Sequence, residues 1–128
     1  MDNRAYRLLK LATPGPYTFL LEATKEAPRF ASPASRRTVG LRVPDHRVTQ
    51  ELLAMFGKPL LGTTLFPQGE DLPLNDPEEI RQRYQKLIQA VVDAGGCSME
   101  PTTVVDLTGE APEVGRVGRG PVEALGLA

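Results

Sequence analysis

Apolar residues are spaced like those of short strands in some segments of the chain and like those of helices in others. The predicted strands span residues 17–22, 38–43, 60–65, 103–107 and 114–117. The predicted helices span residues 2–11, 48–56 and 76–87. Because strands and helices alternate, the pattern predicts an α/β or α+β sheet protein and excludes a helix bundle.

Proline and glycine mark the ends of the predicted helices. The first helix stops at the Pro-Gly-Pro turn of residues 14–16, and the second ends at Gly57 with Pro59 beyond it. The third begins at Asp76, a favourable N-cap, with Pro77 at its first helical position. These signals predict helices that begin and end within a residue or two of the marked positions.

Two segments show no apolar periodicity. Residues 27–37 hold two prolines, two serines and three arginines, which predicts an exposed basic loop. Residues 120–128 are expected to form a C-terminal tail that nothing anchors. The domain itself is therefore assigned to residues 1–119.

The composition describes one domain that is rich in turns. Of its 128 residues 41% are hydrophobic, and it has twelve glycines and twelve prolines. No apolar run approaches the roughly 20 residues that span a bilayer, and the N-terminus lacks the apolar core of a signal peptide. We therefore predict a cytoplasmic protein without a membrane partner.

The overall charge does not identify a partner. Fifteen Lys and Arg residues against sixteen Asp and Glu residues give a formal charge of −1, although a local basic patch could still bind nucleic acid. The single cysteine, Cys97, has no second cysteine with which to form a disulfide or a metal site. It is predicted to be a reduced thiol near a turn.

Two polar residues stand in or beside predicted strands. Thr18 opens an apolar strand, where its hydroxyl could bind a ligand at the strand end or bond the turn backbone. Arg42 lies within the strand of residues 38–43. On the inner face its guanidinium would need an anion, whereas simple alternation with Gly40 would point it to water.

Further hydroxyls and arginines lie near other predicted strand ends. The threonine pairs at residues 63–64 and 102–103 could bind phosphate or a hydroxyl-bearing substrate, although threonine is also a common strand residue. Arg116 and Arg119 flank Gly118, where a phosphate could approach the backbone or where both arginines could be ordinary surface residues. The only histidine, His46, is predicted to lie in a surface loop.

Four motifs in order resemble the YrdC-like family, which includes threonylcarbamoyl-AMP synthases and the YciO branch. The motifs are PGPYTF (residues 14–19), TVGLRVPDH (38–46), TTVVDL (102–107) and RVG (116–118). The resemblance implies an α/β fold, a YrdC/RibB-like twisted mixed sheet with flanking helices and a concave basic face. Family synthases combine ATP, bicarbonate and L-threonine into threonylcarbamoyl-adenylate, the donor for a tRNA modification.

The resemblance also implies roles for five residues at matching positions. Thr18 and Thr64 would lie near the nucleotide, and Arg116 near the adenylate. Arg42 and Thr102 would lie near the threonine substrate. ATP would enter as a substrate, with or without Mg, and the resemblance assigns neither a catalytic residue nor a protein-ligated metal.

The chain departs from the synthase pattern in two places. Synthases carry an asparagine two residues after the serine that corresponds to Thr64, and here Phe66 replaces it, as in the YciO branch. The family's N-terminal portion, with a lysine and arginine pair that grips the substrates, has no counterpart. Met1 is therefore expected to be an internal start, an artificial boundary or the start of a truncated gene product, and the partial domain to be inactive alone.

Two further expectations follow from this resemblance. One alternative function is a non-catalytic module that binds nucleotide or double-stranded RNA, including tRNA. With its earlier strands missing, the sheet is also expected to self-associate through an exposed edge, to pair with a separate N-terminal piece or to be marginally stable.

Overall fold

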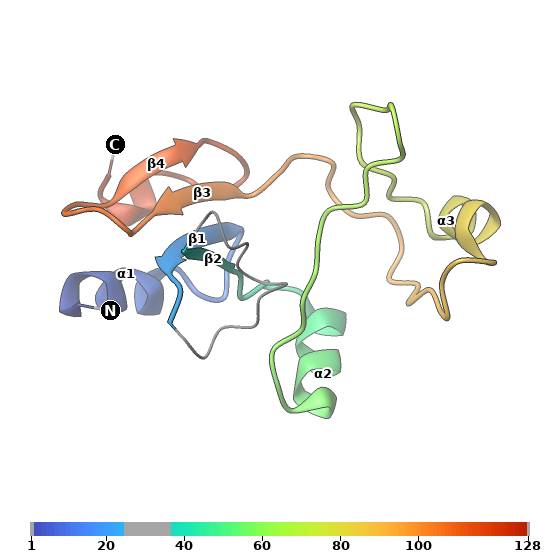
Figure 1. Ribbon diagram of the computed structural model, residues 1–128, viewed down its shortest axis with the longest axis horizontal. Helices are drawn as coiled ribbons and strands as arrows, with labels where there is room; N and C mark the ends of the chain where they lie inside the picture. The colour runs from blue at the N-terminus through green and yellow to red at the C-terminus, as the bar shows by residue number, and fades with distance from the viewer. Residues whose placement is uncertain (1, 25–36, 128) are drawn as a thin grey trace. The chain divides into compact units, whose positions relative to one another are not determined.

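The computed structural model describes residues 2–24 and 37–127, which form two compact units. The first, called the sheet unit below, comprises Met1–Pro59 and Pro101–Ala128, and the second unit comprises Leu60–Glu100. The sheet unit contains α1 (Asn3–Ala12), β1 (Tyr17–Glu22), β2 (Thr38–Leu41), α2 (Arg47–Phe56), β3 (Thr103–Asp106), β4 (Glu113–Arg116) and the 3-10 helix η1 (Glu123–Leu125). The second unit contains α3 (Pro77–Tyr84) (Figure 1).

Four strands form one mixed sheet in the order β2-β1-β3-β4. β1 pairs parallel with β3 and antiparallel with β2, and β3 pairs antiparallel with β4. The parallel pair places Tyr17 opposite Thr103 and Phe19 opposite Val105. Segments far apart in the sequence therefore form the centre of the sheet, and the predicted α/β fold with a mixed sheet is confirmed.

The strand boundaries follow the predictions closely where a partner strand exists. β1 has the predicted bounds, β2 ends two residues earlier than predicted, β3 ends one residue earlier, and β4 begins and ends one residue earlier. Beyond the end of β2, the C=O of Val43 accepts a hydrogen bond from the Gly15 N–H at 2.9 Å. Residues 42–43 therefore leave the ladder of the sheet to contact the turn before β1.

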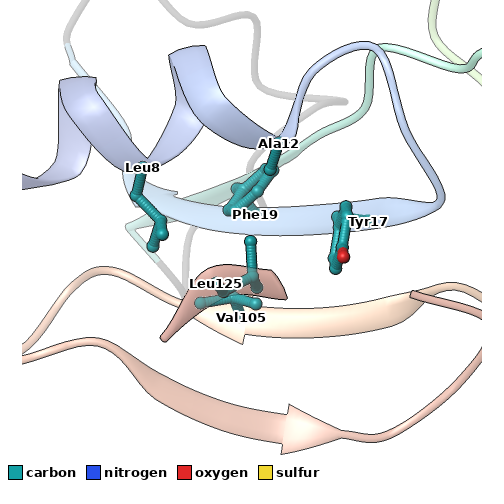
Figure 2. Packing of buried hydrophobic residues seen from close by; sticks show 6 residues of the cluster. All are labelled: Leu8, Ala12, Tyr17, Phe19, Val105 and Leu125. Carbon is teal, nitrogen blue, oxygen red and sulfur yellow. The ribbon is translucent and has the colours of Figure 1, made fainter. Parts of the chain in front are cut away.

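One face of the sheet carries the hydrophobic core (Figure 2). Phe19 and Val105 are fully buried, and Tyr17 is 5% exposed. The cluster comprises Leu8, Ala12, Tyr17, Phe19, Val105 and Leu125. These side chains come from α1, β1, β3 and η1, so the central strands pack against elements from both ends of the chain.

The residues after Gly120 are anchored to this core, and the expectation of an unanchored tail is wrong. Leu125 is buried with 7% exposure, and the C=O of Pro121 accepts a hydrogen bond from the Tyr17 hydroxyl at 2.8 Å. Burial of that hydroxyl raises the pKa of Tyr17, and the nearby charge of Glu123 raises it further. A single turn of 3-10 helix has too few residues to show a periodic apolar pattern, which is why the sequence did not predict this packing.

The loop after β4 lies directly against the segment that enters β3. A Cβ atom on Gly118 would collide with the backbone of Pro101 and Thr102, and one on Gly120 would collide with the ring of Tyr17. Both positions therefore require glycine because of close approach, not because of a left-handed backbone.

The three predicted helices are confirmed, and their caps explain where they begin and end. Asp2 accepts a hydrogen bond from the Ala5 N–H at 2.8 Å and so caps α1, while Asp76 caps α3. α2 ends at Gly57, which has φ 77°, as a C-terminal glycine in the left-handed region does. α3 ends at Tyr84, three residues earlier than predicted.

The strand predicted at residues 60–65 is wrong. Among the described residues this segment pairs with no strand, and its Leu65 C=O accepts one backbone hydrogen bond, from the Leu74 N–H at 2.9 Å. Leu60 and Leu61 are 47% and 63% exposed. An apolar run becomes a strand only when a neighbouring strand pairs with it, and the local sequence does not show whether such a strand exists.

Two other predictions concern the basic loop and the membrane. Residues 27–36 of the predicted loop at residues 27–37 lie outside the described residues. Arg37 is exposed, and its C=O accepts a hydrogen bond from the Ala23 N–H at 2.7 Å.

In the described part of the chain, none of the helices has the length and apolar character needed to cross a bilayer.

The core predicts a large effect of truncating Phe19. Replacing this fully buried ring in Phe19→Ala should lower the free energy of unfolding by roughly 3–5 kcal/mol, because the surrounding side chains cannot fill the cavity. Met55→Ala is the control, since Met55 is 87% exposed and should change it by less than about 0.5 kcal/mol. Urea unfolding of both variants measures the difference, and equal effects would contradict the assigned core.

The close approach at Gly118 predicts that even one methyl group is destabilising there. Gly118→Ala should cost about 1–3 kcal/mol, because its Cβ would overlap backbone atoms that cannot rotate away. Gly109→Ala is the matched control, since a Cβ there would lie 3.8 Å from the Ala111 carbonyl oxygen, an ordinary van der Waals contact. Thermal unfolding should show a lower midpoint for the first variant only.

Candidate functional site

Four of the five residues that the sequence proposed as site residues lie at the face of the sheet opposite the core, called the open face below. Thr18 lies between two buried core residues of β1, so its side chain points to the open face. Gly40 shares this face, because a Cβ built on it would lie 3.5 Å from Thr18 Cγ2. Arg42 follows the end of β2 and is exposed, so its guanidinium does not face the core, and the charges of Arg119 and Arg116 act on it.

A β-bulge brings Arg116 to the same face. Simple alternation would place Arg116 on the side of Val114, two residues before it. In the structure Val114 pairs with Val105, but Arg116 pairs with Val104, so Gly115 is an extra residue in β4. Arg116 therefore shares the face of Val104, which is the open face.

Two threonine hydroxyls meet on this face, where the two central strands begin. The Oγ1 atoms of Thr18 and Thr102 lie 2.7 Å apart in a hydrogen bond for which either can be the donor. Thr102 is 7% exposed, whereas Thr18 is half-buried. The parallel pairing of β1 with β3 brings these two positions together, although 84 residues separate them in the sequence.

Arg116 donates hydrogen bonds to the same threonine, Thr102. Its Nε and Nη2 atoms donate to the Thr102 carbonyl oxygen at 3.1 and 2.9 Å, and Nη2 lies 3.3 Å from Thr102 Oγ1. A guanidinium held through one edge keeps its remaining N–H donors free for a ligand. Its planar fork suits a carboxylate or phosphate group.

Three arginines add positive charge to this part of the sheet unit. Partial loss of hydration lowers the pKa of Arg42, and the like charges of Arg119 and then Arg116 lower it further. None of the ion pairs within residues 2–24 and 37–127 involves these three side chains. An anion bound among them would relieve their mutual repulsion.

We call the group formed by Thr18, Arg42, Thr102, Arg116 and Arg119 the arginine–threonine face. Four of these residues were proposed from the sequence as site residues. Arg119 was noticed beside Gly118 but was not assigned to the site. Its signal in the sequence was the arginine pair around that glycine.

The fifth proposed residue, Thr64, belongs to the second unit. It is exposed and lies outside any strand or helix, as does Thr63 beside it. Phe66 in the same segment is 52% exposed. The structure places this segment only within its own unit, so the nucleotide-binding role of Thr64 remains a prediction.

His46 and Cys97 lie outside the arginine–threonine face as we define it. His46 precedes α2 as its N-cap residue and is half-buried, and its Nδ1 atom is buried with no hydrogen-bond partner among the residues that the structure describes. Cys97 is an exposed free cysteine in the second unit. In the portion of the chain that the structure describes, no three His, Cys, Asp or Glu side chains are grouped to hold a metal ion.

Comparison with known proteins identifies the family. The Sua5/YciO/YrdC family model, described as "Telomere recombination", matches residues 1–118. The YciO protein of Escherichia coli K12 is 44% identical over 123 residues, which cover 96% of this chain and 60% of YciO. The E. coli YciO crystal structure has a TM-score of 0.88 at 43% identity, and the match covers 98% of this chain and 61% of that chain.

Two further relatives carry more specific names. The threonylcarbamoyl-AMP synthase of Serratia proteamaculans is 31% identical over 98 residues, which cover 76% of this chain and 51% of the synthase. P. abyssi Sua5 complexed with L-threonine has a TM-score of 0.84 at 25% identity, and the match covers 96% of this chain and 36% of that chain. This chain thus spans 60% of the length of YciO and smaller shares of the other two. The resemblance that the four motifs predicted is confirmed, and the chain belongs to the Sua5/YciO/YrdC family.

Proposed function

We propose that the arginine–threonine face binds ATP and L-threonine, the substrates that threonylcarbamoyl-AMP synthases join with bicarbonate. The observation that carries the proposal is the contact among three residues, in which Thr18 bonds Thr102 and Arg116 holds Thr102. Two further arginines without a carboxylate partner in the described ion pairs lie near it. Such a group binds an anion through charge-assisted hydrogen bonds.

The roles of the residues follow the chemistry of the product. Thr18 contacts the nucleotide, Thr102 and Arg42 contact the threonine carboxylate, and Arg116 contacts the adenylate phosphate. In threonylcarbamoyl-adenylate the amino acid and the nucleotide are joined in one molecule, so their binding residues must adjoin. The 2.7 Å contact between Thr18 and Thr102 supports this assignment.

The reaction needs positioning and charge neutralisation rather than a covalent protein intermediate. The threonine amine forms a bond to the bicarbonate carbon with loss of water, and a carbamate oxygen then displaces pyrophosphate from the ATP α-phosphorus. Arginines fixed around the carboxylate and the phosphates hold the reactants together and offset their charge. Mg would be carried on the ATP phosphates, and Thr64 would add a hydroxyl to the nucleotide.

A second candidate function is nucleotide or RNA binding without turnover. The observation that favours it is the same set of exposed arginines on one face of a chain whose overall charge is only −1. RNA binding through these charges would weaken steeply as the salt concentration rises. Threonine binding, by contrast, would occur whether or not RNA is present. Binding of double-stranded RNA with a steep salt dependence, together with no response to threonine, would favour this second function.

Ligand-dependent stability tests the proposal directly. ATP with L-threonine should raise the thermal midpoint of the chain by about 10 °C at roughly 100 times Kd, because the ligands bind only the folded state. Arg42→Ala and Arg116→Ala should each weaken binding about tenfold or more, since each removes a charge-assisted contact. The control is Arg47→Ala, because Arg47 pairs with Glu51 and its side chain is 89% exposed. Equal binding by all four proteins would contradict the assigned site.

Phe66 allows a separate test of nucleotide binding. It stands where synthases carry an asparagine, so its side chain offers no amide to the nucleotide. Phe66→Asn should tighten ATP binding by restoring an amide, as measured by calorimetric titration. The matched control is Leu72→Asn, a similar change at a 65% exposed residue of the same unit, which should leave ATP binding unchanged. An unchanged affinity in the Phe66 variant would show that this position does not contact the nucleotide.

A further inference from the structure

Thr103 has a buried hydroxyl that the proposed site does not use. The residue is 0% exposed and belongs to the core face of β3. Its Oγ1 accepts a hydrogen bond from the Gly118 N–H at 2.9 Å and donates one to the Gly120 C=O at 2.6 Å. One side chain thus connects the start of β3 to two points in the loop after β4.

Neighbouring contacts also hold the loop after β4, one of them to the residues before β3 and one to β1. The Arg119 N–H donates to the Pro101 C=O at 2.9 Å, and the Pro121 C=O accepts from the Tyr17 hydroxyl at 2.8 Å. Gly118 has no space for a side chain against Pro101. Residues 118–120 therefore lie in one fixed register against residues 101–103, and Pro121 is held by Tyr17.

This register controls where Arg116 can reach. Arg116 precedes Gly118 by two residues, and its guanidinium donates to the carbonyl oxygen of Thr102, the residue next to Thr103. Val in place of Thr103 would keep nearly the same shape but would leave the Gly118 N–H and the Gly120 C=O without their buried partner. A loop that moves toward water to regain these hydrogen bonds would pull on the end of β4, where Arg116 lies.

We propose that Thr103 is a positioning residue, whose buried hydroxyl holds residues 118–120 against residues 101–103 and so keeps Arg116 on Thr102. The proposal rests on the proposed function, because the position of Arg116 affects binding only if Arg116 contacts a substrate. Thr103 itself contacts no ligand. Its effect on binding passes through Arg116.

Binding of ATP to single and double variants tests this dependence. Thr103→Val should lose about tenfold in ATP affinity at a temperature where it is fully folded, whereas Thr103→Ser, which keeps the hydroxyl, should stay within about threefold of the wild type. The double variant with Arg116→Ala should bind no more weakly than Arg116→Ala alone. Leu8→Ala, which lowers stability from the α1 side of the core, is the control and should leave affinity unchanged. Full affinity in Thr103→Val, or an effect that adds completely to that of Arg116→Ala, would overturn the proposal.

A ligand-free measurement separates this proposal from the proposed function. The ¹⁵N relaxation order parameter of the Arg116 Nε–H should be near the rigid value of about 0.85 in the wild type and in Thr103→Ser. It should fall below about 0.6 in Thr103→Val, while the backbone N–H of Phe19 stays rigid. An unchanged Arg116 signal in Thr103→Val would overturn the positioning role. A wild type that binds neither ATP nor threonine would instead overturn the proposed function, and the relaxation result would still decide the role of Thr103.

Discussion

The parallel pairing of β1 with β3 is the constraint on which the rest of the sheet unit depends. It brings Tyr17 opposite Thr103 and Phe19 opposite Val105, across a large separation in the sequence. Closing so long a loop costs conformational entropy, which the buried core of these two strands must offset. Once the pair is formed, β2 and β4 add to its two sides by antiparallel pairing. The contact between Thr18 and Thr102 is a direct consequence of this pairing.

Local patterns in the sequence predicted the elements whose stability is mostly local or whose partner strand exists. α1 and α3 begin at aspartate caps, and α2 ends at a left-handed glycine. β1 has the predicted bounds because alternate residues of this strand are buried in the core. The segment at residues 60–65 has similar composition but no strand to pair with among the described residues. The anchoring of Leu125 was missed for a related reason, since one buried leucine in a single turn carries no period.

Part of the arginine–threonine face was predicted from the sequence. The roles of its residues came from the order of the four family motifs and not from hydrophobic periodicity or charge. Thr18, Arg42, Thr102 and Arg116 were singled out near predicted strands and received roles because they stand in family motifs. The structure places them in one unit, in or directly beside the strands of the sheet. Composition could not show the cluster, because a formal charge of −1 for the whole chain does not reveal a local excess of positive charge. Alternation alone would have placed Arg116 beside Val114, and only the bulge at Gly115 corrects this.

Stability and binding are coupled in this fold because β3 serves both faces of the sheet. Thr103 and Val105 point into the core, while Val104 and the preceding Thr102 belong to the open face. A slip of one residue in β3 would exchange the two sets, burying Val104 and turning the Thr103 hydroxyl away from Gly118 and Gly120. The apolar core penalises that slip strongly, since it would expose Val105 to water. The packing that fixes the register of β3 therefore also fixes the hydroxyl that Arg116 contacts.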